Sequence, residues 1–302
     1  VYTDYRALLE SNECDAVVVA TPNHTHRDVL DDVLTTDLAV LVEKPLATTV
    51  EDCRRIIELT EERSAPVWVG LEYRYMPPVA RMLDELRHGV TGDIKMIAIR
   101  EHRFPFLVKV GDWNRFSRNS GGTLVEKCCH YFDLMRLIAG VEPVRVVASG
   151  AQDVNHLDEV YDGERSDIID NAFVIVEFET GIRAHLDLCM FAEATRNQDE
   201  ISVVGAAGKV EALIPDDEVR IGRRGTHSIG DVEVHEVANT IAVQAHHHGS
   251  SMVENLKFLD VIRNGGEPEV TVHDGLWSVA VGVAAHRSIE ESRWVDVSDV
   301  LA

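Results

Sequence analysis

Three continuous apolar runs alternate with two helical patterns over the first seventy residues, and this alternation constrains the fold more than any other feature. A run that is apolar throughout, rather than at every second position, is typical of a strand buried on both faces. Strand–helix–strand order with short connections predicts a parallel sheet with right-handed crossovers. The expected elements are strands at residues 15–21, 38–43 and 66–71 and helices at residues 24–36 and from Thr48, where Glu51 completes a capping-box pattern.

From about Asp93 the pattern changes to extended segments separated by short turns. Residues 179–182 and 205–208 are turn sequences between neighbouring strands, which favours a largely antiparallel sheet. We therefore expect two domains, residues 1–75 and residues 76–302, the first α/β and the second α+β with a large open sheet. The extended segments of the second are residues 93–101, 144–150, 171–179, 182–188, 201–204 and 209–214, and its helices are residues 124–139, 251–264 and 273–291.

The charge balance of the chain is strongly acidic. Against 52 acidic residues stand 29 basic ones, of which six are lysine, for a net charge of −23. This argues against a nucleic-acid partner, because phosphate binding needs a clustered positive surface. An acidic, lysine-poor surface is expected of proteins that stay soluble in high salt, where ions screen the self-repulsion. An acidic protein from a cell of ordinary salt content is the alternative.

No segment indicates a membrane, a secretory route or a metal site. No apolar run approaches the roughly 20 residues of a membrane-spanning helix, and the chain does not open on a basic and then apolar segment. Five scattered cysteines do not make a disulfide framework and fit a reducing cytoplasm. Adjacent Cys128 and Cys129 are expected to be small buried residues. The consecutive histidines at residues 246–248 cannot easily ligate one metal, and we expect a loop there, either solvated or at a substrate pocket.

Two polar tripeptides follow the first two predicted strands. Thr21-Pro22-Asn23 closes one and Glu43-Lys44-Pro45 closes the other. Ligands of open parallel sheets bind at the carboxyl ends of the strands, so both tripeptides are expected at one binding edge. A lysine beside a buried strand can have its pKa lowered and serve as a proton donor or relay. A solvated surface lysine is the simpler alternative for Lys44 taken alone.

A second polar patch begins at Gly121-Gly122 and continues to Glu126 and His130. Glu126 and His130 are four residues apart on the predicted helix and therefore share a face. A carboxylate beside an imidazole favours the charged imidazolium and can fix the orientation of the ring. Asp133, on the adjoining turn, is either a second orienting group or a surface charge.

These motifs, in this order, resemble the glucose–fructose oxidoreductase / inositol dehydrogenase family (Gfo/Idh/MocA), and the resemblance covers effectively the whole chain. It implies a Rossmann doubly wound domain that binds NAD or NADP, and a substrate-binding domain whose open sheet also holds a homo-oligomer together, as a dimer or tetramer. The implied reaction is hydride transfer between the nicotinamide and a secondary hydroxyl of a sugar, polyol or inositol-like substrate. The matching positions are residues 4–9, 20–24, 26, 43–45, 70–74, 121–122, 130, 133 and 205 and the two C-terminal helices.

The resemblance also implies roles for individual residues. Lys44 would be the catalytic lysine and His130 the acid/base group at the reacting hydroxyl, with Glu126 positioning the histidine. The residues expected at the cofactor are Thr21, Pro22, Asn23, His26, Glu43, Lys44, Trp113 and Arg115, and those expected at the substrate are Lys44, Lys127, His130, Asn155 and His246. No metal is expected.

Three features depart from the family pattern. No G-x-G-x-x-G phosphate loop occurs in the sequence, so we expect a chain without the N-terminal portion that carries it, either a fragment or a cofactor-free descendant. Glu126 stands in place of an aspartate and Cys128 in place of a glycine, which leaves open a shifted geometry or a role for Lys127. An NAD-dependent glycosidase of the same fold and a non-catalytic sugar-binding or subunit protein are the alternative functions.

Overall fold

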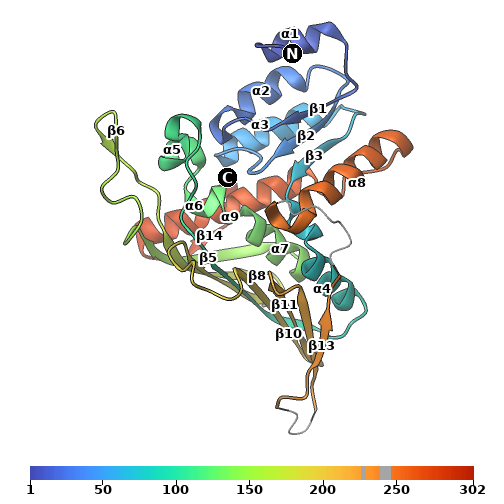
Figure 1. Ribbon diagram of the computed structural model, residues 1–302, viewed down its shortest axis with the longest axis vertical. Helices are drawn as coiled ribbons and strands as arrows, with labels where there is room; N and C mark the ends of the chain where they lie inside the picture. The colour runs from blue at the N-terminus through green and yellow to red at the C-terminus, as the bar shows by residue number, and fades with distance from the viewer. Residues whose placement is uncertain (226–228, 239–245) are drawn as a thin grey trace.

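The computed structural model describes residues 1–225, 229–238 and 246–302, and Figure 1 shows a small sheet above a large one. The small sheet is parallel, in the order β1-β2-β3, which confirms the predicted arrangement. Its strands are β1 Ala16–Val19, β2 Ala39–Glu43 and β3 Val67–Gly70, and its helices are α1 Tyr5–Ser11, η1 Asn23–Thr25, α2 His26–Val33 and α3 Val50–Thr60.

The strands of the small sheet differ in burial. β3 is buried along its length, and so is β2 apart from Glu43 at its end. β1 pairs with β2 alone among the described strands, and Val18 is 55% exposed. The prediction of a strand buried on both faces is therefore wrong for β1, because the face that carries Val18 is not covered by any described element.

The helix after β2 begins one residue later than the capping pattern predicted. Thr49 is the N-cap of α3, and its hydroxyl accepts a hydrogen bond from the backbone N–H of Asp52 at 3.1 Å. The pair Thr48 and Glu51 has the same spacing, so the pattern alone could not choose between them. Thr48 belongs to the preceding loop, where its carbonyl packs against Gly121.

The large sheet has nine strands in the order β13-β12-β11-β10-β4-β9-β8-β5-β14. Every described pair is antiparallel except β4 with β9, which confirms a mostly antiparallel sheet. The two predicted turns join β8 to β9 and β10 to β11. Its strands are β4 Ile94–His102, β5 Pro143–Ala151, β8 Asn171–Phe178, β9 Arg183–Cys189, β10 Asp199–Gly205, β11 Gly208–Ile214, β12 Glu218–Arg223, β13 Glu233–Glu236 and β14 Val295–Asp296.

Sequence patterns missed several shorter elements. These are β12, β13, β14, the hairpin of β6 Val160–Tyr161 with β7 Glu164–Arg165, and the helices α1, α4 Pro77–Arg87 and α10 Ser298–Leu301. The domain boundary at residue 75 stays a prediction. Within the described ranges, no helix combines the length and the apolar character needed to cross a membrane.

Helices cover one face of the large sheet and connect it to the small one (Figure 1). The long helix α9 Val272–Glu291 contacts β5 of the large sheet and both α3 and β3 of the small-sheet part. α7 Cys129–Ala139 packs between α9 and β4, and α8 Ser250–Asn264 contacts β3. The two sheets therefore share a continuous core, and loops from both can meet between them.

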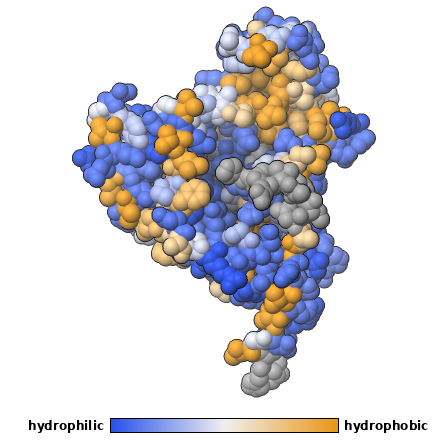
Figure 2. Space-filling model, viewed as in Figure 1, coloured by the Kyte–Doolittle hydropathy of each residue, from blue (hydrophilic) through white to orange (hydrophobic). Residues whose placement is uncertain are grey.

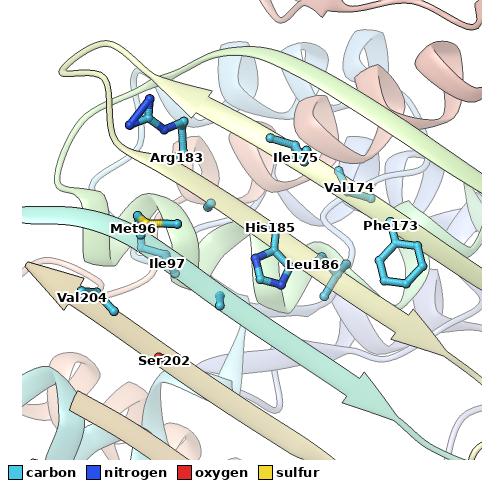
Figure 3. A pocket seen from close by; sticks show the side chains of 12 residues that line it. Met96, Ile97, Phe173, Val174, Ile175, Arg183, His185, Leu186, Ser202 and Val204 are labelled. Atoms are coloured by element: carbon cyan, nitrogen blue, oxygen red, sulfur yellow. The ribbon is translucent and has the colours of Figure 1, made fainter. Parts of the chain in front are cut away.

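The opposite face of the large sheet is open and partly apolar. Side chains alternate along β8, so that Val174 is buried whereas Phe173 and Ile175 are 64% and 43% exposed. Figure 3 shows Phe173, Met96 and His185 on this face, with the helices behind the sheet. The view of Figure 2 is mostly hydrophilic, with apolar patches between the polar residues.

A buried ion pair joins the segment after β3 to α7. The guanidinium group of Arg74 donates two hydrogen bonds to the carboxylate of Asp133, one from Nε at 2.7 Å, and a third to the carbonyl of Glu269 at 2.8 Å. Asp133 is 1% exposed. It is therefore neither a surface charge nor an orienting group for His130, and both expected roles for Asp133 are wrong, because its oxygens are bound to Arg74.

We expect Arg74→Met to lower the free energy of unfolding by about 3–5 kcal/mol, because it leaves the buried carboxylate of Asp133 without its partner. Denaturant unfolding followed by circular dichroism measures this. The control is Arg287→Met, which removes an exposed pair with Glu291 on α9 and should leave the midpoint unchanged. Equal midpoints for Arg74→Met and the wild type would contradict a stabilising role for the pair.

Candidate active site

Polar loops from both parts of the molecule meet at the carboxyl edge of the small sheet. After β1, Asn23 donates from Nδ2 to the carbonyl of Ser120 at 3.1 Å. After β2, Lys44 donates from Nζ to the carbonyl of Glu126 at 3.0 Å. The acceptors belong to the short helices α5 Ser117–Ser120 and α6 Thr123–Glu126. Both predicted tripeptides therefore lie against the second predicted patch.

Lys44 keeps its positive charge at this edge. Burial alone would lower the pKa of Lys44, but surrounding acidic groups outweigh burial and hold that pKa above its ordinary value. Burial raises the pKa of the Cys129 thiol to about 12, so at neutral pH the attraction comes from glutamates. The expectation of a lowered pKa for Lys44 is wrong, and the ammonium group is a hydrogen-bond donor rather than a base. These glutamates are Glu126, Glu72 and Glu43.

The helix predicted over residues 124–139 is interrupted near its start. α6 ends at Glu126 and α7 begins at Cys129, with Lys127 and Cys128 between them. A spacing of four residues places two side chains on one face only within a continuous helix. Glu126 is 5% exposed and burial raises its pKa, while the opposing charges close to it are led by Lys44. The predicted pairing of Glu126 with His130 is therefore not formed, and its carboxyl group lies instead in the field of Lys44.

His130 is fully buried near the start of α7. The ring of Tyr73 stacks on it, with centroids 3.9 Å apart and planes 5° from parallel. Neither ring nitrogen has a hydrogen-bond partner in the described part of the chain. Burial, and next the positive charge of Lys44, place the pKa of His130 well below its ordinary value. The ring is therefore neutral at physiological pH, contrary to the predicted imidazolium, and one nitrogen is available to accept a proton.

Glu72 is the site residue that sequence reasoning missed. It opens η2 Glu72–Tyr75, directly after β3, and is 5% exposed. Its Oε1 lies 2.6 Å from Nδ1 of His247, and its Oε2 lies 3.8 Å from Nδ1 of His130. The available signal was position: Glu72 follows the third strand as Asn23 and Lys44 follow the first and second.

Two predicted ligand contacts are already paired inside the protein. Lys127 donates from Nζ to the hydroxyl of Tyr73 at 2.5 Å and lies 3.0 Å from Glu101 Oε1. Arg115 is 2% exposed and donates from Nε to Glu159 Oε2 at 2.9 Å. Because these bonds engage their charged groups, neither cation is presented to a ligand in this conformation.

Two residues predicted at the cofactor differ in their placement. Trp113, in η3 Val110–Arg115, is partly exposed and faces His24 after β1 with ring centroids 6.3 Å apart. His26 is fully buried, and its ring nitrogens lie 2.9 Å from the carbonyl of Pro45 and 3.0 Å from that of Thr21. Trp113 can therefore border a ligand, whereas His26 holds the two tripeptide loops together from behind.

Two residues predicted at the substrate have no described link to Lys44 or His130. Asn155 donates from Nδ2 to the carbonyl of Met190 at 2.7 Å, near the end of β9, and is buried. His246 opens η4 His246–Gly249, and its side chain lies outside the described residues.

The glycine pair upstream of His130 has a steric explanation. A Cβ atom on Gly122 would lie 2.5 Å from Nε2 of His286 on α9, and Gly121 has a φ of +84°. The same Nε2 accepts a hydrogen bond from the backbone N–H of Leu124 at 3.1 Å. Burial lowers the pKa of His286 to about 4, which keeps the nitrogen free to accept. The pair thus lets the backbone before α6 approach α9.

Behind Glu72, a second buried carboxyl group projects from α8. Glu254 is 2% exposed, and Oε1 accepts a hydrogen bond from Nε1 of Trp68 at 3.3 Å. Burial, together with repulsion from Glu72 and Glu43, raises the pKa of Glu254 to about 9. Glu254 is therefore protonated at neutral pH, which limits the negative charge beside Lys44.

The arrangement suits an organic ligand with hydroxyl groups. Buried polar atoms that lack a partner in the described ranges include Glu72 Oε2, Glu126 Oε2 and both ring nitrogens of His130. Such atoms favour a ligand that supplies hydrogen-bond donors. The loops after β1 and β2 lie where parallel sheets bind dinucleotides, so they fit the nicotinamide end of such a cofactor. No group of three or more His, Cys, Asp or Glu among the described residues is arranged to hold a metal ion.

Comparisons with known proteins agree with this geometry. Residues 1–71 match the model "Oxidoreductase family, NAD-binding Rossmann fold" of the Gfo/Idh/MocA group, and residues 84–297 match "Oxidoreductase family, C-terminal alpha/beta domain". Myo-inositol 2-dehydrogenase of Thermotoga maritima is 27% identical over 99% of this chain and 85% of its own length. Inositol 2-dehydrogenase of Rhizobium meliloti is 27% identical over 97% of this chain and 83% of its own length. The crystal structure of a probable dehydrogenase from Thermotoga maritima superposes with a TM-score of 0.79 at 25% identity, covering 99% of this chain and 85% of that one.

We expect Glu254→Gln to flatten the pH dependence of stability. A carboxyl group whose pKa is about 9 when folded and about 4.3 when unfolded stabilises the fold fully below the lower value, and this stabilisation is lost as the pH rises toward 9. Glutamine removes the titration and can still accept from Trp68. The thermal midpoint of the variant relative to the wild type should therefore rise from pH 6 to pH 9. Parallel curves would contradict the raised pKa, and exposed Glu58→Gln is the control.

Proposed function

The chain belongs to the Gfo/Idh/MocA family of oxidoreductases, and we propose that it transfers a hydride between a nicotinamide cofactor and a secondary hydroxyl of a sugar, polyol or inositol-like substrate. The two relatives named as inositol dehydrogenases, each aligned over nearly the whole chain, support this substrate class. The observation that carries the proposal is His130, buried and neutral, with both ring nitrogens lacking a described partner beside Lys44 at the carboxyl edge of the sheet.

The site residues divide the handling of one hydroxyl group between them. His130 accepts the hydroxyl proton, because its lowered pKa leaves the ring neutral. Lys44 donates a hydrogen bond to the same oxygen and stabilises the negative charge that grows there, because its raised pKa keeps the ammonium group charged. A nicotinamide bound along the loops after β1 and β2 would supply the acceptor for the hydride of the substrate carbon. The protein's part is thus alignment and proton transfer.

For the cofactor, we propose that the nicotinamide end lies along the loops after β1 and β2, with Trp113 at the border. Thr21, Pro22, Asn23, Glu43 and Lys44 then contact it. We propose a positioning role for His26, which holds the two loops together, and for Arg115, which is paired with Glu159. Assays with NAD and with NADP decide between the two cofactors.

For the substrate, the proposed contacts narrow to Lys44 and His130. Lys127 and Asn155 bind protein groups, so we propose that they support the surrounding loops instead. The two alternative functions, an NAD-dependent glycosidase and a non-catalytic sugar-binding protein, receive no support from the relatives described above, which are named as dehydrogenases.

We also propose that the protein assembles through the open face of the large sheet and works in a cytoplasm of high salt. Met96, Phe173 and Ile175 form an exposed apolar patch there, and burial of such a patch favours association. Five cysteines that are all free fit a reducing compartment. A net charge of −23 on each subunit opposes assembly until salt screens it.

We expect Lys44→Ala and His130→Ala each to lower kcat by about 10²- to 10⁴-fold, because each removes a group that handles the reacting hydroxyl. The measurement is NADH or NADPH formation by the natively produced protein with myo-inositol, scyllo-inositol and D-glucose. Exposed Lys95→Ala and His88→Ala are the matched controls. Undiminished turnover in either site variant would overturn that assignment, and hydrolysis of a nitrophenyl glycoside without net NADH formation would favour the glycosidase.

We expect Phe173→Asp to shift the protein toward lower mass in light scattering, because it places a charge in the apolar patch of the open face. The wild type should give a multiple of the chain mass, with more assembly in molar KCl than in dilute buffer. The control is Val160→Asp, the same kind of change on an exposed residue of β6. A wild type that is monomeric at all salt concentrations would overturn assembly through this face.

A further inference from the structure

Glu72 lies between two imidazole rings, and each of its oxygens faces one of them. Oε1 lies 2.6 Å from Nδ1 of His247, which is a short hydrogen bond, and Oε2 lies 3.8 Å from Nδ1 of His130. The hydrogen bond with His247 restrains one oxygen of the carboxylate, and the other oxygen lies on the side of His130.

The ring of His130 is also held in place. Tyr73, the neighbour of Glu72 in η2, stacks on the ring, and the Tyr73 hydroxyl accepts a hydrogen bond from Lys127. His247 meets the ring of Tyr73 edge-on, with centroids 5.2 Å apart. His247 itself has a φ of +57°, an uncommon backbone conformation for a residue with a Cβ. Strain of this kind at the anchor of a buried carboxylate points to a functional constraint.

The gap between Glu72 and His130 is the unusual part of this arrangement. A separation of 3.8 Å is too long for a hydrogen bond. Yet Glu72 Oε2 and His130 Nδ1 are both buried and both lack a partner within the described part of the chain. Leaving two such atoms unpaired is unfavourable. Hydrogen bonds of catalytic groups are often long in ligand-free structures and shorten when substrate binds.

Glu126 does not occupy an equivalent position. The break between α6 and α7 separates it from His130, and its closest opposing charges are led by Lys44 and Lys109. Its own backbone carbonyl accepts the hydrogen bond from Lys44. The two glutamates thus face different partners, Glu72 the histidine and Glu126 the lysine.

We propose that Glu72, anchored by His247, is the positioning carboxylate of His130. Glu72 accepts the Nδ1–H of the ring, which leaves Nε2 unprotonated and able to take the hydroxyl proton of the substrate. The imidazolium that forms is then stabilised by the carboxylate, while the hydride leaves the substrate carbon for the nicotinamide. This inference rests on the proposed dehydrogenase function.

Several charged groups besides Glu72 act on the two side chains. Those that act on His130 are Lys44 after β2, Lys127 between α6 and α7, Arg103 after β4 and His247 in η4. Those that interact with the carboxylate of Glu72 are Glu43 at the end of β2 and Glu254 on α8. The groups listed for His130 lower its pKa, whereas a carboxylate 3.8 Å from the ring opposes them. We therefore expect removal of the Glu72 carboxylate to lower the pKa of His130 further.

The test compares Glu72→Gln, Glu72→Asp and Glu126→Gln over the pH range, with exposed Glu58→Gln as the control. For Glu72→Gln we expect kcat to fall by about 10- to 100-fold with KM little changed, and the acidic limb of the kcat profile to move to lower pH. Glu72→Asp, which keeps the charge, should restore part of the loss. Glu126→Gln should leave the acidic limb in place and move the basic limb to lower pH, because it weakens the field that keeps Lys44 protonated.

An independent readout needs neither substrate nor cofactor. In protein labelled with ¹⁵N-histidine, the nitrogen shifts of His130 identify the tautomer, and a His130→Asn sample assigns the signals. We expect the Nδ1–H tautomer in the wild type and a mixture in Glu72→Gln. His247→Phe removes the anchor and keeps Glu72, so it should shift the tautomer of His130 in the same direction by a smaller amount. This variant replaces Glu72→Gln in the test if Glu72→Gln fails to fold.

The outcomes separate this inference from the proposed function. The role of Glu72 would be overturned if Glu72→Gln kept the kcat of the wild type and the acidic limb of its pH profile. It would also be overturned if the acidic limb moved in Glu126→Gln and not in Glu72→Gln. An unchanged tautomer in both Glu72→Gln and His247→Phe would do the same. A wild type that binds no dinucleotide and oxidises no polyol would instead overturn the dehydrogenase function, while the tautomer of His130 would still report on Glu72.

Discussion

The positive charge of Lys44 is the constraint on which the rest of the site depends. Its ammonium group donates to the carbonyl of Glu126 and so ties the end of β2 to the end of α6, across 82 residues of sequence. The glutamates around it keep the group charged. That charge, added to burial, keeps His130 neutral. A charged hydrogen-bond donor and a neutral proton acceptor are therefore present in the same buried region at one pH, and oxidation of an alcohol needs both.

The parts of the site that follow from local pattern were predictable from the sequence. Polar residues after the parallel strands predicted the positions of Asn23 and Lys44, and the turn sequences predicted the hairpins of the large sheet. The parts that depend on distant neighbours were not. Glu72 and Glu126 help to raise the pKa of Lys44 above its ordinary value, and no rule of sequence spacing predicts that they lie near the lysine.

The break in the helix at Lys127 shows the same limit at short range. Residues 124–139 contain no proline, and no glycine before the end of the apolar pattern, so periodicity predicts one helix. In the structure, the side chain of Lys127 is drawn to Glu101 and to the hydroxyl of Tyr73, both contributed by remote segments. These contacts come from segments far away in the sequence, so the local helical periodicity contains no information about them. The face shared by Glu126 and His130 was lost with the helix, and with it the predicted carboxylate–imidazole pair.

The acidic character of the chain also has a local counterpart that composition could not reveal. Glu43, Glu72, Glu126 and Glu254 crowd one buried region, and burial raises the pKa of three of them, Glu43, Glu126 and Glu254. Such crowding is unfavourable for folding, since like charges in low dielectric repel. Protonation of Glu254 relieves this repulsion, and the Glu254 carboxyl group faces Trp68 rather than His130. Glu72 can then remain an acceptor between two imidazoles, and Glu126 can remain the counter-charge of Lys44. Local conflicts of this kind persist in folded proteins mainly where function requires them, which is the strongest physical reason to place the chemistry at this edge of the sheet.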